Sequence, residues 1–586
     1  MSDAGQTWRR SRTQRARRWL IGAALALVAA VSVISAQRQH GIARDEVPYM
    51  SHGMKYARWW IDLASGRDGT ATRRHITETF GGPAATDNNR EHPPLIKTLF
   101  GMSRIVLHER LGWASEVTTS RVPTALLHAA AVAMMFAFAA QLWGSAAGLF
   151  AGLLFLLLPR AFFHAGLATF DAPMVTLWLA TLLAYYKSLA SRWWGLGLAV
   201  AFGLALATKH NALMLPGVIL SHYAWIAWRR SAASETSSRA DRLRAFGRAL
   251  IRTQPLLAPA LAIGGPLVLI AVWPWLWFDT FDHVRDWIAF HTHHVHYNFE
   301  YLGRNYNHPP FPWHVVLVTT LLTVPVATLA AAAVGAVHLA GRARAGTSAQ
   351  PERAPALLLV LSAAVSMGVF LLPSTPIFGA EKHWAPAMPT FCILAGVGIA
   401  GAGDRICRYL VGRGWIPEAG NFAGSAAALA LGSLVATAAL TETVAAQPYA
   451  LSHYNALAGG APGGADLGMN RQFWGYAARG VLPYLDEHAA PAPGQPPVPV
   501  YTHDASPAWG LYRRAGLVHP GLPDSGHESR GAIPRSRVAL VIHERHFLRH
   551  DILVWRAYGT VQPDYVLSFQ GVPLVSVYVR PPPAGR

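Results

Sequence analysis

The sequence predicts a multi-span α-helical membrane protein with about 11 transmembrane helices and a small C-terminal extracytoplasmic α/β domain. Apolar runs of about 20 residues, the length that crosses a hydrocarbon core of ~30 Å, recur along the first three quarters of the 586 residues. Only 14% of the residues are charged and 52% are hydrophobic, whereas soluble domains carry roughly a quarter charged residues. The last segment lacks long apolar runs and contains the alternating β-branched stretches that are typical of strands.

The first apolar run, Trp19–Ala36, follows 18 residues with six arginines. We interpret it as an uncleaved first span rather than a cleaved signal peptide, because the run is long. The polar residues 37–120 then predict a large first outer loop with helices at the membrane interface. Ten further runs follow, near Arg121–Gln141, Gly144–Leu158, Asp171–Tyr186, Trp194–Thr208, Asn211–Trp228, Pro255–Trp275, His314–Leu339, Ala354–Leu372, Pro386–Ile399 and Phe422–Leu440.

The arginines between the runs set the orientation. From a cytoplasmic N-terminus, Arg229–Arg252 with seven arginines lies in the cytoplasm, as do Arg342–Arg353 and Arg405–Arg413 with three each. This agrees with the positive-inside rule. The net charge of +19 is therefore explained by loops beside a lipid bilayer, and no nucleic acid is expected as a partner. An odd number of spans sends the chain end outside.

We divide the chain into a membrane domain, 1–441, and an extracytoplasmic domain, 442–586. The second domain has ten acidic residues against twelve arginines. Within it, Arg537–Ile542 predicts a strand, and Tyr565–Val579 predicts a hairpin that turns at Gln570 and Gly571.

Ionisable groups collect where the predicted spans meet the outer face. Asp45 and Glu46 follow the first span, and a carboxylate there can act as general base for a hydroxyl while its neighbour raises its pKa or binds a cation. The alternative is a solvated pair that caps a helix. In NNREHPPLIK, two prolines hold His92 in a rigid segment that can present His92 and Lys97 to a phosphate. The alternative is an interfacial turn before a helix.

The order of these motifs along the chain is informative. The carboxylates after the first span, HPPL with a following lysine, SRVPTAL, ATFDAPM and PYALSHYNALAGG together resemble polyprenyl-phosphate-dependent glycosyltransferases of the GT-C superfamily. The chain is most similar to the family 39-like bacterial relatives of protein O-mannosyltransferases and of the lipid A aminoarabinose transferase. It departs from the pattern at Ile96, where glycine is usual, and at His453, where tyrosine is usual.

The resemblance implies three catalytic carboxylates, with Asp45 as base, Glu46 as its partner, and Asp171 near the acceptor or a bound cation. It also implies a set of groups that bind the donor phosphate: His92, Lys97, Arg121, Lys209 and Lys382.

The implied function is transfer of a sugar, a hexosyl or pentosyl group, from a polyprenyl-phosphate donor to an acceptor on the outer face of the bacterial cytoplasmic membrane. The acceptor can be a protein, a lipid or a glycan. The chemistry agrees, because a lipid-phosphate sugar needs a base for the acceptor hydroxyl and cations for its phosphate leaving group. The alternatives are a transporter or flippase of a polar lipid, which would place charges at mid-membrane, and a non-catalytic scaffold that presents the last domain.

The run HTHHVH suggests a metal site. On a helix, His291 and His294 are spaced i, i+3, which can bring two imidazoles onto one ion. The alternative is an outer helix whose histidines face water or headgroups. The sequence implies no certain cofactor and leaves room for a divalent cation.

Overall fold

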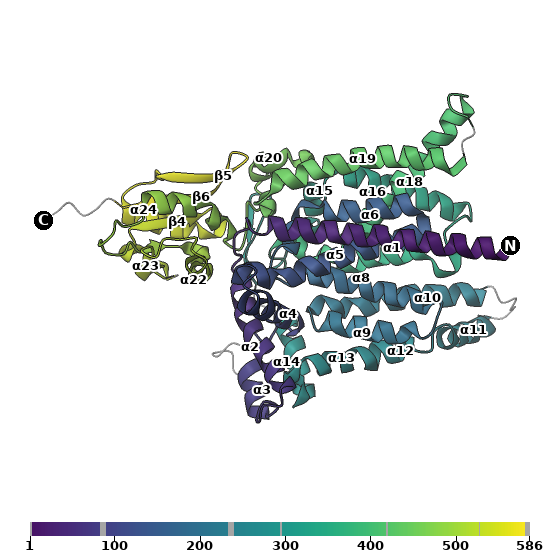
Figure 1. The fold of residues 1–586 in the computed structure, drawn as a ribbon, viewed down its shortest axis with the longest axis horizontal. Helices are drawn as coiled ribbons and strands as arrows, with labels where there is room; N and C mark the ends of the chain where they lie inside the picture. Colours follow the sequence, from purple (N-terminus) through teal and green to yellow (C-terminus); the bar gives the residue numbers. More distant parts are fainter. Residues whose placement is uncertain are drawn as a thin grey trace.

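A computed structural model describes residues 3–81, 89–232, 239–293, 296–417, 420–526 and 528–580. Long helices run side by side and form a bundle (Figure 1). Each predicted apolar run coincides with a helix or a broken helix. These are α1 (Asp3–Ala36), α5 (Glu116–Trp143), α6 (Ser145–Leu156), α8 (Asp171–Ser188), α9 (Trp194–Leu206), α10 (Leu215–Ala232), α12 (Leu257–Pro259) with α13 (Gly265–Val272), α15 (Val315–Thr323) with α16 (Val326–Arg344), α17 (Pro355–Gly368), α18 (Met388–Gly412) and α19 (Gly420–Ala446).

Among the described residues, six helices are long and apolar enough to cross a membrane. The number is eight if each of two bent pairs is one span: Ser145–Leu156 with α7 (Pro159–Ala165), bent by 70°, and Ala240–Arg252 with Leu257–Val272, bent by 58°. The chain is therefore a multi-pass membrane protein, while the count of eleven stays a prediction.

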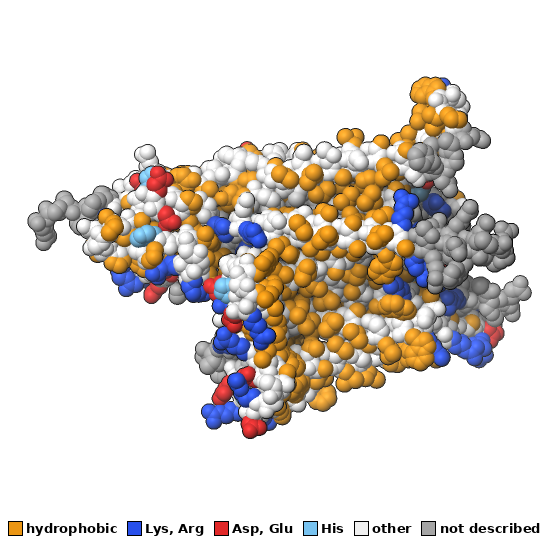
Figure 2. Space-filling view, in the orientation of Figure 1, with side chains coloured by type: hydrophobic (Ala, Val, Ile, Leu, Met, Phe, Trp, Pro, Cys, Tyr) orange, Lys and Arg blue, Asp and Glu red, His pale blue; other side chains and the backbone are white. Residues whose placement is uncertain are grey.

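Hydrophobic side chains cover the visible face of the helical bundle, and charged side chains gather at its two ends (Figure 2). The N-terminus and α11 (Arg239–Arg252), which carries five arginines, lie at one end. The C-terminal domain lies at the other end, which we call the domain end (Figure 1).

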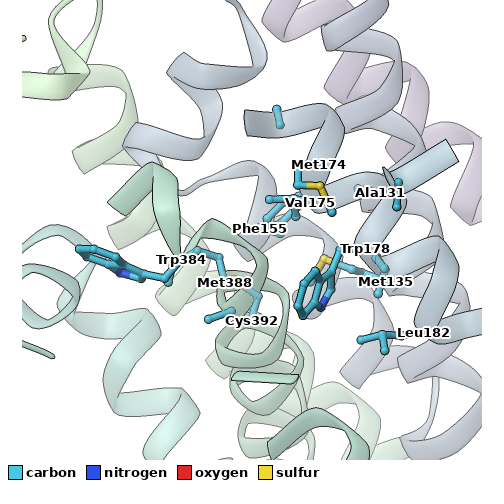
Figure 3. Close-up of a cluster of buried hydrophobic side chains, with 14 of the residues drawn as sticks. Ala131, Met135, Phe155, Met174, Val175, Trp178, Leu182, Trp384, Met388 and Cys392 are labelled. Carbon is cyan, nitrogen blue, oxygen red and sulfur yellow. The ribbon is translucent and has the colours of Figure 1, made fainter. Parts of the chain in front are cut away.

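Helix α18 lies at the centre of the bundle. In its most apolar window 72% of the residues are buried, against 22% in that of the first helix. Small residues let its backbone approach its neighbours, because a Cβ on Gly396 would lie 2.2 Å from Ala147 O of α6, and one on Gly398 would lie 2.1 Å from Ala331 O of α16. Side chains of α5, α8 and α18, among them Met135, Trp178 and Cys392, form the buried cluster drawn in Figure 3.

Short helices cross the domain end of the bundle (Figure 1). They are α2 (Glu46–Ala64), α3 (Arg73–Phe80), α4 (Leu95–Ser103) and α14 (Thr280–Thr292). The first three belong to the loop 37–120, for which the sequence predicts interfacial helices.

The C-terminal domain contains a four-stranded sheet of order β3-β4-β6-β5. Strands β3 (Val500–Tyr501) and β4 (Val538–Ile542) are parallel, and β6 (Val572–Val579) is antiparallel to β4 and to β5 (Tyr565–Phe569). The predicted hairpin is confirmed, and Gln570 and Gly571 form its turn with positive φ values of 49° and 83°. Helices α22 (Ser506–Arg514), α23 (Ser529–Arg535) and α24 (Leu548–Tyr558) complete this domain.

The C-terminal domain packs on the loop 37–120, which the sequence predicts to be the first outer loop. Ile42 N donates to Tyr512 Oη at 2.6 Å, Arg44 pairs with Asp504 at 2.7 Å, and Arg514 pairs with Glu116 at 2.9 Å. One buried apolar cluster includes residues of both parts. The last helix of the bundle, α19, ends at Ala446, so the division predicted at 442 falls inside a helix.

Candidate active site

A cavity of about 740 Å³ lies at the domain end, between the helical bundle, the outer-loop helices and the C-terminal domain. We call it the site cavity. Six of the predicted site residues line it: Asp45, His92, Asp171, Lys209, Lys382 and His291. Three others, Glu46, Lys97 and Arg121, do not belong to its lining.

Asp45 is the carboxylate that the first outer loop presents to the site cavity. It precedes the first residue of α2, and its side chain caps no backbone N–H of that helix. A carboxylate is stabilised at a helix N-terminus by the helix dipole. Its side chain is 28% exposed, and Arg44 Nε lies 3.6 Å from Oδ1. Asp45 can therefore accept a hydrogen bond from a ligand in the cavity.

Glu46 does not share this position. Both oxygens of its carboxylate are bound, by Arg121 Nε at 2.7 Å and Nη2 at 2.6 Å and by the backbone N–H groups of Ala168 at 2.7 Å and Ala43 at 2.9 Å. Glu46 is 0% exposed and Arg121 is 1% exposed. The sequence predicts that Glu46 is a catalytic partner and Arg121 a phosphate ligand. In the structure the two groups bind each other inside the protein, and neither lines the site cavity.

Arg121 also binds the backbone at the end of the first helix. Its Nη1 donates to Gln37 O at 3.0 Å and its Nη2 donates to Gly41 O at 2.7 Å. The pair therefore ties together the entry to α5, the loop before α2 and the loop before α8. Its effect is to fix the backbone that carries Asp45.

Lys97 is likewise internal, with 0% exposure. Its Nζ donates to Asn89 O at 2.6 Å and to Asn89 Oδ1 at 3.0 Å. The predicted phosphate contact of Lys97 would therefore compete with these bonds, by which the ammonium stabilises the turn at 89–92. His92 of that turn lines the site cavity, with its ring 5.2 Å from Phe170 and 5.7 Å from Tyr49.

Asp171 begins α8 and pairs with Lys209, whose Nζ lies 2.8 Å from Oδ1. His164 of α7 lies 3.8 Å from Asp171 Oδ2 and 3.8 Å from Glu381 Oε1. Arg160 Nη1 in turn binds Glu381 Oε2 at 2.6 Å. These five buried groups form a chain in which basic and acidic side chains alternate under the site cavity, and Asp171 and Lys209 are the members that line it.

Lys382 has a different environment. Within the described residues no ion pair or hydrogen bond of its Nζ is found; the ammonium lies 4.3 Å from the ring centre of Trp474 and 5.1 Å from that of Phe378. Gly379, at φ +67°, allows the side chain to fold back, because a Cβ there would lie 2.5 Å from Lys382 Cε. Burial lowers the pKa of Lys382 to about 8, against the opposite effect of Asp45 and Asp171.

Four histidines add to the same part of the lining: His92, His210, His291 and His383. The rings of His210 and His291 stack with centres 4.0 Å apart. Burial is the main cause that lowers the pKa values of His210 and His383. Both imidazoles are therefore neutral near pH 7. His294, the other predicted metal candidate, lies outside the described residues. Among the described residues, no group of three or more His, Cys, Asp or Glu side chains is arranged to hold a metal ion.

Several lining residues have no counterpart in the sequence prediction. Tyr49 and Phe170 pack with ring centres 4.2 Å apart, and the C-terminal domain contributes Glu544 and His546. Tyr49 lies four residues after Asp45 and so one helical turn along α2. Glu544 follows β4 by two residues. The order of the elements gives no indication that this loop reaches the membrane domain.

Residues 92–238 match the family model of dolichyl-phosphate-mannose-protein mannosyltransferases. ArnT from Cupriavidus metallidurans, solved bound to undecaprenyl phosphate, is 16% identical, with 95% of this chain and 97% of that chain covered and a TM-score of 0.43. The Archaeoglobus fulgidus oligosaccharyltransferase is 11% identical, with 92% of this chain and 72% of that chain covered and a TM-score of 0.46. No curated protein sequence matches the chain.

A third solved structure, the S. cerevisiae protein O-mannosyltransferase complex Pmt1-Pmt2, is 18% identical over 44% of this chain and 33% of that chain, with a TM-score of 0.31. The family model confirms the resemblance that the motifs indicate. The chain resembles a glycosyltransferase of the GT-C superfamily, and the matched residues include His92, Asp171 and Lys209.

Proposed function

We propose that the protein transfers a sugar from a polyprenyl-phosphate donor to an acceptor hydroxyl at the outer face of a bacterial cytoplasmic membrane. The observation that supports this function best is the content of the site cavity. It joins a carboxylate that is open to ligands, Asp45, to two ammonium groups, Lys209 and Lys382, at the end of an apolar bundle. A base and cations beside a bilayer are what a lipid-phosphate donor requires.

Asp45 is the general base in this proposal. It accepts the proton of the acceptor hydroxyl as the hydroxyl oxygen attacks C1 of the sugar. The bond from C1 to the phosphate oxygen breaks, and polyprenyl phosphate leaves with the electron pair. Glu46 and Arg121 act as positioning residues, because their buried ion pair fixes the loop on which Asp45 stands.

Lys382 and Lys209 stabilise the charge that develops on the leaving phosphate. Lys382 meets aromatic rings in place of an anion, so an incoming phosphate would supply its counter-charge. Lys209 is held at the cavity wall by Asp171. The lipid tail of the donor would extend from this point along the apolar surface of the bundle (Figure 2).

The test compares cell-envelope glycans and glycoproteins by mass spectrometry in cells that lack the protein, that carry it, or that carry Asp45→Asn. We expect one sugar modification to depend on the wild-type protein and to be absent with Asp45→Asn. Glu487→Gln is the matched control, because Glu487 is an exposed acid of the C-terminal domain. Movement of a lipid across the membrane with no new glycosidic bond would contradict the proposal and favour a transporter.

A further inference from the structure

The C-terminal domain contributes an acid to the site cavity. Glu544 stands in the loop after β4 and lines the cavity, and its side chain is only 7% exposed. Its Oε1 is buried and has no hydrogen-bond partner among the described residues. Its Oε2 lies 3.6 Å from His546 Nδ1, a nitrogen to which the Asn298 amide donates at 2.8 Å. A buried carboxyl oxygen without a hydrogen-bond partner is costly, so Oε1 indicates a ligand.

The surroundings of Glu544 contain more acid than base. Asp504 and Asp45 are both close enough to Arg44 to pair with it, at 2.7 Å and 3.6 Å. Arg44 also acts on Glu544 electrostatically. Asp504 Oδ2 is buried without a hydrogen-bond partner in the described structure. Burial, with Asp504 and Glu300 adding to it, raises the pKa of Glu544 well above its ordinary value. The raised pKa favours the protonated carboxyl, and a positive group brought into this part of the cavity would favour the carboxylate instead.

We propose that Glu544 binds an ammonium group of the acceptor and so selects acceptors that carry a positive charge near the reacting hydroxyl. This inference rests on the proposed function, since it names the acceptor of that reaction. An organic ammonium fits better than a metal ion, because the described residues provide no group of three metal-binding side chains. An ammonium needs one carboxylate and hydrogen-bond acceptors.

The site cavity would then be divided by charge. Lys209 and Lys382 belong to the membrane domain and receive the anionic donor. Glu544 belongs to the C-terminal domain and receives the cationic acceptor. Asp45 follows Arg44 directly, and Arg44 is bound to Asp504 of the C-terminal domain. The base therefore stands where the two domains meet, which is the position that a hydroxyl of the acceptor must reach.

The test uses the full-length protein in nanodiscs and two probes of similar size that both carry a hydroxyl, ethanolamine and 1-propanol. Binding is followed by saturation-transfer nuclear magnetic resonance. We expect ethanolamine to bind about 10-fold or more tightly than 1-propanol, the low end of the range for a charge-assisted hydrogen bond. Glu544→Gln should remove this preference, and Glu487→Gln should keep it. Because Oε1 has no partner to lose, Glu544→Gln should leave thermal unfolding and the binding of undecaprenyl phosphate unchanged.

Equal binding of the two probes by the wild-type protein would overturn the inference, and this measurement requires no variant to fold. Displacement of ethanolamine by low concentrations of Mg²⁺ would overturn it too, in favour of a metal site. Probe binding does not depend on transfer. A protein that prefers ethanolamine but transfers no sugar would contradict the proposed function alone, and one that transfers sugar without the preference would contradict this inference alone.

Discussion

Glu46 and Arg121 form a bidentate ion pair that lies wholly inside the protein, with N to O distances of 2.7 Å and 2.6 Å. The neighbouring residue, Asp45, faces the site cavity. Two adjacent carboxylates thus have different surroundings, because α2 begins between them and turns one outward and one inward. The inward acid fixes the backbone, and the outward acid is free to react.

The first prediction concerns this pair. Glu46→Gln leaves the guanidinium of Arg121 buried without its counter-charge, so we expect the free energy of unfolding to fall by about 3–5 kcal/mol, the cost of breaking a buried pair. Thermal unfolding of the purified protein in detergent measures the effect. Asp45→Asn is the control, and it should unfold at the wild-type temperature. A Glu46→Gln protein as stable as the wild type would show that the pair does not hold the loop.

The helices and the hairpin could be predicted from sequence because their signals are local. The length of an apolar run and the two residues Gln570 and Gly571 are properties of short segments. The site was predicted only in part, because the motif residues share chemistry but not orientation. Arg121 and Lys382 are both cations near span ends that the sequence predicts to be outer. Only the folded chain shows that Arg121 contacts a carboxylate whereas Lys382 contacts aromatic rings.

The contribution of the C-terminal domain could not be predicted for a similar reason. Glu544 is far from Asp45 in sequence, yet both line the site cavity. Beside them, Arg44 contacts Asp45 and pairs with Asp504 of the C-terminal domain. No local pattern specifies such a contact. It depends on how the domain packs on the first outer loop, through contacts such as that between Ile42 and Tyr512.

The second prediction tests the base. Asp45→Asn preserves the size of the side chain and removes its ability to take a proton, so the turnover number should fall by about 10²- to 10⁴-fold. Binding of undecaprenyl phosphate should remain within about twofold, because a carboxylate does not attract a phosphate. Single-turnover transfer and lipid binding are measured on the same preparation. Wild-type turnover in Asp45→Asn would remove Asp45 from the mechanism.

A third prediction separates the cations. Lys382→Ala removes an ammonium that no described residue neutralises by an ion pair, so the affinity for undecaprenyl phosphate should fall roughly 10- to 150-fold, the range for hydrogen bonds to charged groups. Arg242→Ala, in α11 at the opposite end of the bundle, is the matched control and should bind as the wild type does. Equal losses in both variants would mean that the cations act only through the general field of the membrane surface.

The fourth prediction uses the pKa of Lys382, which burial lowers to about 8. A lysine is cationic below its pKa and neutral above it, so affinity for undecaprenyl phosphate should be highest below pH 8 and decrease as the pH rises through that value. Lys382→Arg should remove the decrease, because arginine keeps its charge throughout this range. A titration of lipid binding from pH 6.5 to about pH 9.5 makes the comparison. The same decrease in Lys382→Arg would assign it to another group.

The last prediction concerns the side of the membrane on which the site lies. The N-terminus and α11 lie at the end opposite the C-terminal domain (Figure 1), and the positive-inside rule assigns the arginine-rich end to the cytoplasm. In a background without Cys392 and Cys407, single cysteines at Ser51, Ser374 and Glu487 should therefore react with a membrane-impermeant thiol reagent in intact spheroplasts. All three residues are exposed in the structure. A cysteine at Arg242 should react only after lysis, because it would lie inside. The reverse pattern would place the site cavity in the cytoplasm, where a donor would meet its acceptor before either had crossed the membrane.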